Sequence, residues 1–82
     1  MSNRQHVSLD QLRVGRRAIV RELGGGAIFA SRLAGLGLSL GVELTVLQNR
    51  GHGPVLVRVR DTRIALGRGE AMKIMAEALE SE

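Results

Sequence analysis

Residues 55–66 read VLVRVRDTRIAL, and this stretch decides the fold class. In its first half, valine recurs at every second position with leucine or arginine between, which is the period of a strand with one buried face. We predict a strand over Val55–Arg60, a two-residue hairpin turn at Asp61-Thr62, and a return strand over Arg63–Leu66. The hairpin indicates an antiparallel β-sheet.

Further short segments with strand character surround this hairpin, and turn residues separate them. Arg17–Leu23 and Val42–Gln48 alternate apolar and polar side chains, although Ile19 interrupts the first alternation. A short turn is expected over Gly67–Glu70. A last strand that closes the sheet would bury every second side chain from Met72 through Ile74 to Ala76.

An entry segment precedes these strands. Over Ser8–Val14 we predict a single helical turn capped by Ser8, with three side chains facing the core. These are Leu9, Leu12 and Val14. Short strands at close spacing, with turn signals between them, predict an all-β fold, either a small β-barrel or a sandwich.

One substantial helix is predicted over Ala27–Leu36. Its apolar stripe at helical spacing consists of Phe29, Leu33 and Leu36. Gly37 follows at the position where helices often end with a left-handed residue, and Leu38 comes next, where a Schellman ending places an apolar side chain. The sequence therefore predicts where the helix stops as well as where it lies.

The body of the chain is basic and its end is acidic. The 82 residues carry 12 Lys or Arg and 8 Asp or Glu, for a net charge of +4. We divide the chain into a flexible N-terminus over 1–7, one domain over 8–76 and an acidic tail over 77–82. The absence of cysteine and the polar first residues favour a cytoplasmic protein.

Few side chains in the sequence are suited to catalysis or to metal binding. There is no Cys, Tyr or Trp, and neither His6 nor His52 has an acidic residue at a local spacing that would orient it. Gly24–Gly26 lacks the Lys and Ser or Thr of a phosphate loop. We therefore expect no enzyme, no metal site and no cofactor.

Two kinds of binding surface remain open from the residues alone. Arg58, Arg60 and Arg63 flank the hairpin and would suit phosphates, so nucleic acid is an alternative partner. The single aromatic residue, Phe29, argues against single-stranded nucleic acid, which proteins bind by stacking. Ile28 and Leu40 fall outside the core stripe and would suit a protein partner.

Three stretches of this sequence resemble one known family when they are taken in order. They are LRVGRRAIV at 12–20, RLAGLGLSLG at 32–41, and GPVLV at 53–57 followed by IALG at 64–67 and AMKI at 71–74. Together they resemble the ferrous iron transport protein A (FeoA) family over about residues 8–76. The residues of the central signature are Leu33, Leu36, Gly37, Leu38 and Gly41. Relatives often have proline where this chain has Leu40.

The resemblance implies an all-β, SH3-like barrel of five to six strands with one short helix inserted after the first strand. It also implies a cytoplasmic accessory protein that regulates a FeoB-type ferrous-iron transporter by protein contact, and that meets the membrane only through the transporter. Self-association stays open. Expected exposure, basic charge and proximity in such a barrel select the expected partner-binding residues, which are Ile28, Arg32, Leu40, Arg50 and His52. A narrower hypothesis is that Arg50 acts in trans on GTP hydrolysis by the transporter.

Overall fold

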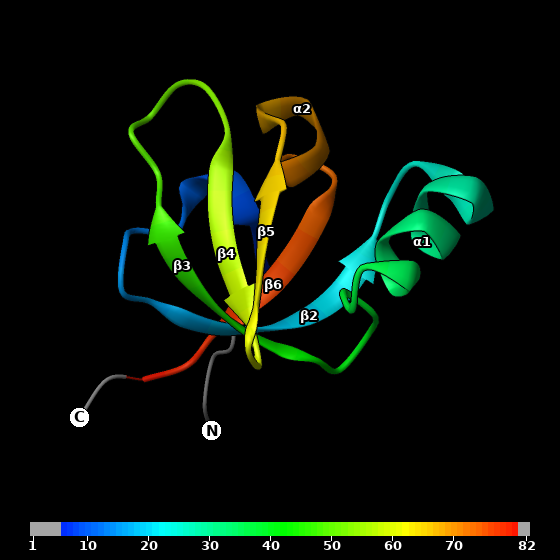
Figure 1. Ribbon diagram of the computed structural model, residues 1–82, viewed down its shortest axis with the longest axis horizontal. Coiled ribbons are helices and arrows are strands. Elements are labelled where there is room, and N and C mark those ends of the chain that lie inside the picture. Colours follow the sequence, from blue (N-terminus) through cyan, green and yellow to red (C-terminus); the bar gives the residue numbers. More distant parts are fainter. Residues whose placement is uncertain (1–5, 81–82) are drawn as a thin grey trace.

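The computed structural model describes residues 6–80, which form one six-stranded antiparallel sheet and three short helices (Figure 1). The strands are β1 (His6–Ser8), β2 (Arg17–Leu23), β3 (Glu43–Gln48), β4 (Val55–Val59), β5 (Thr62–Leu66) and β6 (Ile74–Ala78). The helices are the 3₁₀ turn η1 (Leu9–Gln11), α1 (Gly26–Gly35) and α2 (Arg68–Ala71). The strand order is β1-β6-β2-β3-β4-β5, so β1 and β5 are the two edges.

The sheet is strongly curved, and its concave side encloses the core (Figure 1). Alternate residues of each long strand point inward, as the period-2 pattern requires. The buried apolar side chains are Leu9, Leu12, Ala18, Val20, Phe29, Leu33, Leu38, Leu44, Val46, Val55, Val57, Val59, Ile64, Leu66, Ala71, Ile74 and Ala76. Every long strand and both α-helices therefore contribute to one core.

The predicted strands are confirmed with small shifts at their ends. β2 has the predicted bounds, β3 begins at Glu43, one residue late, and β4 ends at Val59, one residue early. The predicted position of the hairpin turn, Asp61-Thr62, is wrong by one residue. Val59 pairs with Thr62, so Arg60 and Asp61 form the turn. Arg60 has φ +56°, a conformation that the sequence pattern does not reveal because arginine has no preference for it.

Helix α1 ends as predicted. The Leu38 N–H donates to the Leu33 carbonyl at 2.8 Å, and the Gly37 N–H donates to the Ala34 carbonyl at 3.0 Å. Gly37 has φ +100°, and Leu38 is fully buried. These are the two hydrogen bonds of a Schellman ending, with a buried apolar side chain at the position where such an ending places one. Leu36 differs from prediction, since it remains 44% exposed instead of completing the buried stripe.

Two other predicted core residues lie outside the core. Val14 is 58% exposed because it lies in the turn between η1 and β2, and Met72 is 58% exposed because it lies in the turn between α2 and β6. The predicted turn at Gly67–Glu70 mostly forms α2, where the Glu70 carboxylate accepts a hydrogen bond from the Gly67 N–H at 2.9 Å. This contact supports the first turn of the helix.

The sheet extends beyond the expected domain bounds of 8–76 on both sides. His6 and Val7 fall within the segment expected to be flexible, but they lie in β1 and pair with β6. Glu77, which the sequence assigns to the acidic tail, is a buried residue of β6, where Arg21 donates to it at 2.9 Å. Residues 1–5 and 81–82 lie outside the described part of the chain.

Candidate partner-binding surfaces

Helix α1 lies beside the barrel at one end of the molecule (Figure 1). Phe29 and Leu33 pack it against the core, while Ile28 on its first turn is 88% exposed and Leu40 in the following loop is 62% exposed. We call Ile28, Arg32, Leu36 and Leu40 the helix surface. It combines three exposed aliphatic side chains with one cation inside a stretch of 13 residues.

Arg32 holds α1 against α2 instead of standing free. Its guanidinium pairs with the Glu70 carboxylate and lies 5.6 Å from the centre of the Phe29 ring. The ammonium of Lys73 lies 5.5 Å from the same ring. The hydrogen bond from Arg32, followed by the one from the Gly67 N–H, lowers the pKa of the Glu70 carboxyl below its ordinary value.

A shallow groove of about 280 Å³ separates the end of α1 from the β4–β5 hairpin. Its lining residues are Leu36, Gly37, Ser39, Val42, Val59, Arg60 and Thr62. Gly41 lies just before β3 with φ +87°, and its N–H donates to the Val20 carbonyl at 2.7 Å. The signature glycines therefore shape the loop that carries Leu40.

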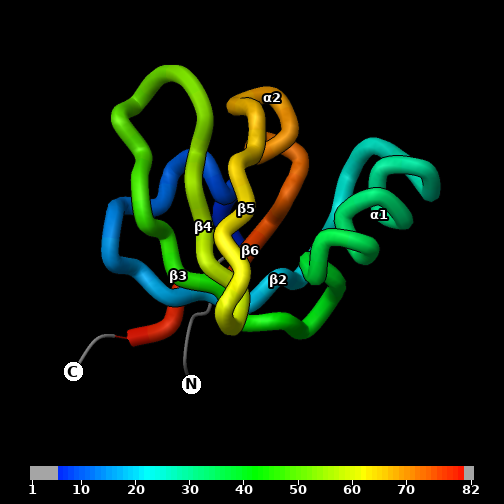
Figure 2. Tube along the Cα trace, viewed as in Figure 1, coloured from blue at the N-terminus to red at the C-terminus, as the bar shows by residue number. Residues whose placement is uncertain are grey.

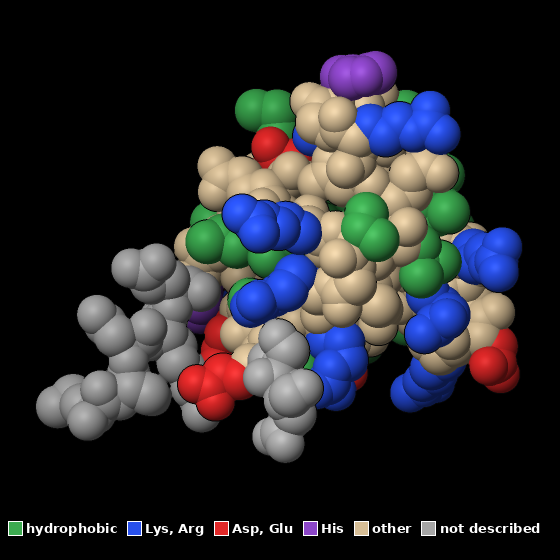
Figure 3. All heavy atoms as spheres, turned by 90° about the vertical axis from the view of Figure 1, so that its left-hand side faces the viewer, with side chains coloured by type: hydrophobic (Ala, Val, Ile, Leu, Met, Phe, Trp, Pro, Cys, Tyr) green, Lys and Arg blue, Asp and Glu red, His purple; other side chains and the backbone are tan. Residues whose placement is uncertain are grey.

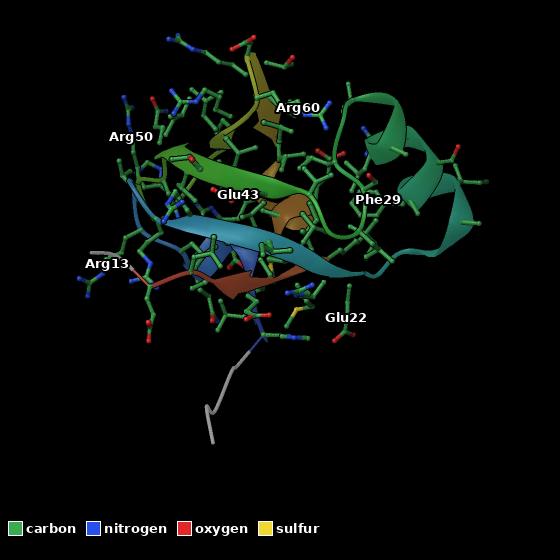
Figure 4. The ribbon with its side chains drawn as sticks, turned by 90° about the horizontal axis from the view of Figure 1, so that it is seen from below. Arg13, Glu22, Phe29, Glu43, Arg50 and Arg60 are labelled. Atoms are coloured by element: carbon green, nitrogen blue, oxygen red, sulfur yellow. The ribbon has the colours of Figure 1, made fainter. Side chains whose placement is uncertain are left out.

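The expected binding residues form two surfaces and not one. Arg50 and His52 are exposed in the loop between β3 and β4, which rises at the end of the molecule away from α1 (Figure 2). Figure 4 likewise places Arg50 and Phe29 at opposite ends, and the longest dimension of the molecule is 35 Å. We call Arg50 and His52 the loop surface. The five expected residues therefore do not form one continuous patch, and their role in binding a partner stays a prediction.

Asn49, which sequence reasoning missed, fixes this loop. Its Nδ2 donates to the carbonyls of Asp10 and Leu12, each at 2.8 Å. Its Oδ1 accepts from the Gly51 N–H at 3.1 Å and from Arg68 Nη2 at 2.7 Å. An Asn two residues before a Gly was the available signal, because Asn in turns commonly accepts from the backbone two residues later.

Basic side chains are spread over the side of the molecule away from α1 (Figure 3). Within residues 6–80, no group of three or more His, Cys, Asp or Glu side chains could hold a metal ion. In the same residues, no helix has the length and apolar character needed to cross a bilayer.

The family model for the FeoA domain matches residues 7–78 of this chain. The chain belongs to the FeoA family. The FeoA match covers the described strands and both α-helices except His6, the first residue of β1, so it includes the helix surface and the loop surface. FeoA proteins are accessory proteins of iron transport and do not form a known enzyme family.

Individual relatives agree with the family assignment. A protein of Methanocaldococcus jannaschii that carries the name Fe(2+) transport protein A is 39% identical over 66 residues, which cover 80% of this chain and 79% of the relative. A crystal structure of an iron uptake regulatory protein, FeoA, has a TM-score of 0.85 at 31% identity and covers 92% of this chain and 100% of its own.

A third relative supplies the name of the fold. The structure of Stenotrophomonas maltophilia FeoA complexed with zinc, described as a prokaryotic SH3 domain protein, has a TM-score of 0.68 at 30% identity, covering 88% of each chain. The fold of the present chain is accordingly SH3-like, as the FeoA resemblance implied. Its helix α1 follows β2, the first long strand.

Proposed function

We propose that this FeoA-family chain serves ferrous-iron uptake in the cytoplasm by binding the cytosolic part of a FeoB-type transporter through its helix surface. The observation that carries the proposal is the exposure of three aliphatic side chains on α1 and the loop after it: Ile28 at 88%, Leu36 at 44% and Leu40 at 62%. Aliphatic side chains scattered singly are ordinary surface, whereas several on one short segment suit a protein contact.

Contacts within the protein hold the helix surface in place. The Schellman ending fixes the loop that carries Leu40, and the ion pair of Arg32 with Glu70 fixes α1 against α2. A surface that is already ordered loses less conformational entropy when it binds, so more of the apolar burial contributes to affinity. Each Å² of apolar surface removed from water contributes roughly 25 cal/mol before those costs.

Regulation would then follow from a difference in affinity. A bound accessory protein shifts the nucleotide or gating equilibrium of a transporter only if it binds one state more tightly than the other. The hypothesis of an arginine acting in trans on GTP hydrolysis would use Arg50 of the loop surface. That residue lies at the opposite end from α1, so it demands a different docked orientation (Figure 4).

The test is an NMR titration of the isotope-labelled chain with the isolated cytosolic domain of a ferrous-iron transporter, with and without a GTP analogue. We expect nucleotide-dependent shifts over residues 26–41. Ile28→Ser and Leu40→Ser should each weaken binding about tenfold, the loss expected when one buried aliphatic contact is removed. Val14→Ser is the matched control, because Val14 is equally aliphatic, 58% exposed and outside the helix surface.

Other outcomes would redirect or remove the proposal. Shifts confined to residues 50–52 would show that the loop surface docks instead, and Arg50→Ala would then test the effect on GTP hydrolysis. Equal losses in Val14→Ser and Ile28→Ser would mean that no specific aliphatic contact exists. An absence of shifts with the cytosolic domain and with the intact transporter would contradict the proposed partner.

A further inference from the structure

The register of the sheet aligns three arginines across its outer face. Arg17 lies opposite Thr45, Thr45 lies opposite Arg58, and Arg58 lies opposite Arg63. Directly paired residues project to the same face of a sheet. We call Arg17, Thr45, Arg58 and Arg63 the arginine row; it crosses from β2 to the edge strand β5.

The two ends of the arginine row differ in how their charge is balanced. Arg17 Nη1 donates to Glu43 Oε2 at 3.2 Å. Arg58 and Arg63 are exposed, and among residues 6–80 neither has an ion pair with a carboxylate. Like charges directly opposite each other destabilise a pair of strands. No ion pair among residues 6–80 offsets the repulsion between Arg58 and Arg63.

Protection of an edge strand would account for Arg63 but not for Arg58. Edge strands commonly carry cations that prevent one copy from pairing with another. Arg63 lies on the edge and fits that explanation, but Arg58 lies on β4, one strand inside the edge. The unpaired cation on the inner strand points to a ligand that neutralises both guanidinium groups.

The edge of β5 is open to such a ligand. Among residues 6–80, β5 pairs with β4 alone, and its other side makes no backbone hydrogen bonds. The next outward-facing pair of residues on β4 and β5 is apolar, because Leu56 lies opposite Ala65. An added strand would therefore meet a cation at one outward position and an aliphatic surface two residues away.

We propose that the open edge of β5 binds an extended acidic segment of a partner protein, which adds one strand to the sheet and places a carboxylate beside Arg63 and Arg58. Guanidinium groups match carboxylates in a bidentate geometry. A second copy of this chain is a poorer occupant, since it would bring its own Arg63 to the same edge. Nucleic acid is also poorer, because Leu56 and Ala65 interrupt the cationic surface.

This site lies on a different element from the helix surface, although Thr62 at the start of β5 lines the same groove as Leu36. Its test requires no transporter. The probe is a blocked, fluorescent peptide whose outward positions alternate Glu and Val, with Thr between them. The matched probes replace Glu by Lys, or methylate alternate backbone nitrogens and leave every charge in place. Binding is measured by fluorescence anisotropy over a salt series, because exposed charges are screened by salt.

We expect the Glu peptide to bind, the Lys peptide not to bind, and the methylated peptide to bind at least tenfold more weakly because a strand ladder needs its donors. Arg58→Gln and Arg63→Gln should each weaken binding about tenfold, as loss of a charge-assisted hydrogen bond does. Arg13→Gln is the control, because it removes the same single positive charge from an exposed residue outside the arginine row. Arg58→Gln should be no less stable than the parent chain, because it removes a repulsion.

Three results would overturn the proposal. The first is equal binding by the native and methylated Glu peptides, which would show charge attraction without strand addition. The second is equal loss in Arg13→Gln and Arg63→Gln, which would show a response to net charge alone. The third is tighter, Arg58-dependent binding of duplex DNA than of the Glu peptide at the same salt concentration, which would make nucleic acid the occupant.

Discussion

Alanine at two neighbouring glycines should change the stability of this protein in opposite directions. Gly37 has φ +100°, which a residue with a Cβ adopts only at a cost of about 1–2 kcal/mol. The new Cβ would meet only Val59 Cγ1, at 3.9 Å, an ordinary contact. Strain in the backbone is therefore the whole effect expected of Gly37→Ala, and its sign is destabilising.

Gly35 is the matched position. It is the last residue of α1, it has no positive φ, and an added Cβ would meet nothing within 4 Å. Gly35→Ala should stabilise the chain by about 0.5–1 kcal/mol, because alanine loses less backbone entropy than glycine in a helix. The two variants should thus differ by about 2 kcal/mol, which for a domain of this size is about 10 °C in Tm.

Circular dichroism is the suitable assay, since the chain contains neither Trp nor Tyr for fluorescence. Thermal unfolding and urea unfolding should give the same order of stability: Gly35→Ala, parent chain, Gly37→Ala. The urea m-value should be unchanged in both variants, because neither changes the surface exposed on unfolding. Equal stability of Gly37→Ala and the parent chain, or a loss in Gly35→Ala, would refute this account of the helix ending.

Two further predictions concern polar contacts. Asn49→Ala removes two donated hydrogen bonds of 2.8 Å and the acceptor for Arg68. It should therefore lower the free energy of unfolding in urea by about 2–3 kcal/mol and speed amide exchange at Gly51. Arg50→Ala, the control, should change stability little. A cost for Asn49→Ala no larger than that for Arg50→Ala would contradict this role. Because the pKa of Glu70 is lowered in the folded chain, its contribution to stability is complete above the ordinary value of 4.5 and is lost as the pH falls through the folded pKa. Glu70→Gln should therefore lower Tm at neutral pH and converge with the parent chain in acid; a Tm difference that grows in acid would contradict the ion pair with Arg32.

Local chemistry made much of the fold predictable from sequence. The alternating valines specify which side chains of β4 face inward, and the Leu36-Gly37-Leu38 sequence specifies the end of α1. Both patterns act over a few residues, so a single sequence contains all the information they need. The turn at Arg60 differs because it is fixed by the pairing of Val59 with Thr62 across the hairpin.

Features that depend on distant parts of the chain were not predictable in the same way. Asn49 acts through carbonyls 39 and 37 residues away, which no local pattern announces. Whether Val14 or Leu12 faces inward depends on how η1 enters the sheet. All five candidate binding residues are exposed. The side on which the β3–β4 loop emerges depends on the sheet topology, which divides them between two surfaces.

The short helix α2 has a consequence for how these two surfaces would behave together. Arg68 at its start bonds to Asn49 and to the Gly53 carbonyl, beneath the loop surface, while Glu70 in the same turn pairs with Arg32 of the helix surface. A ligand that displaced α2 from one end would disturb its contact at the other. The two surfaces would then be energetically linked, and by reciprocity each ligand would change the affinity for the other by the same factor.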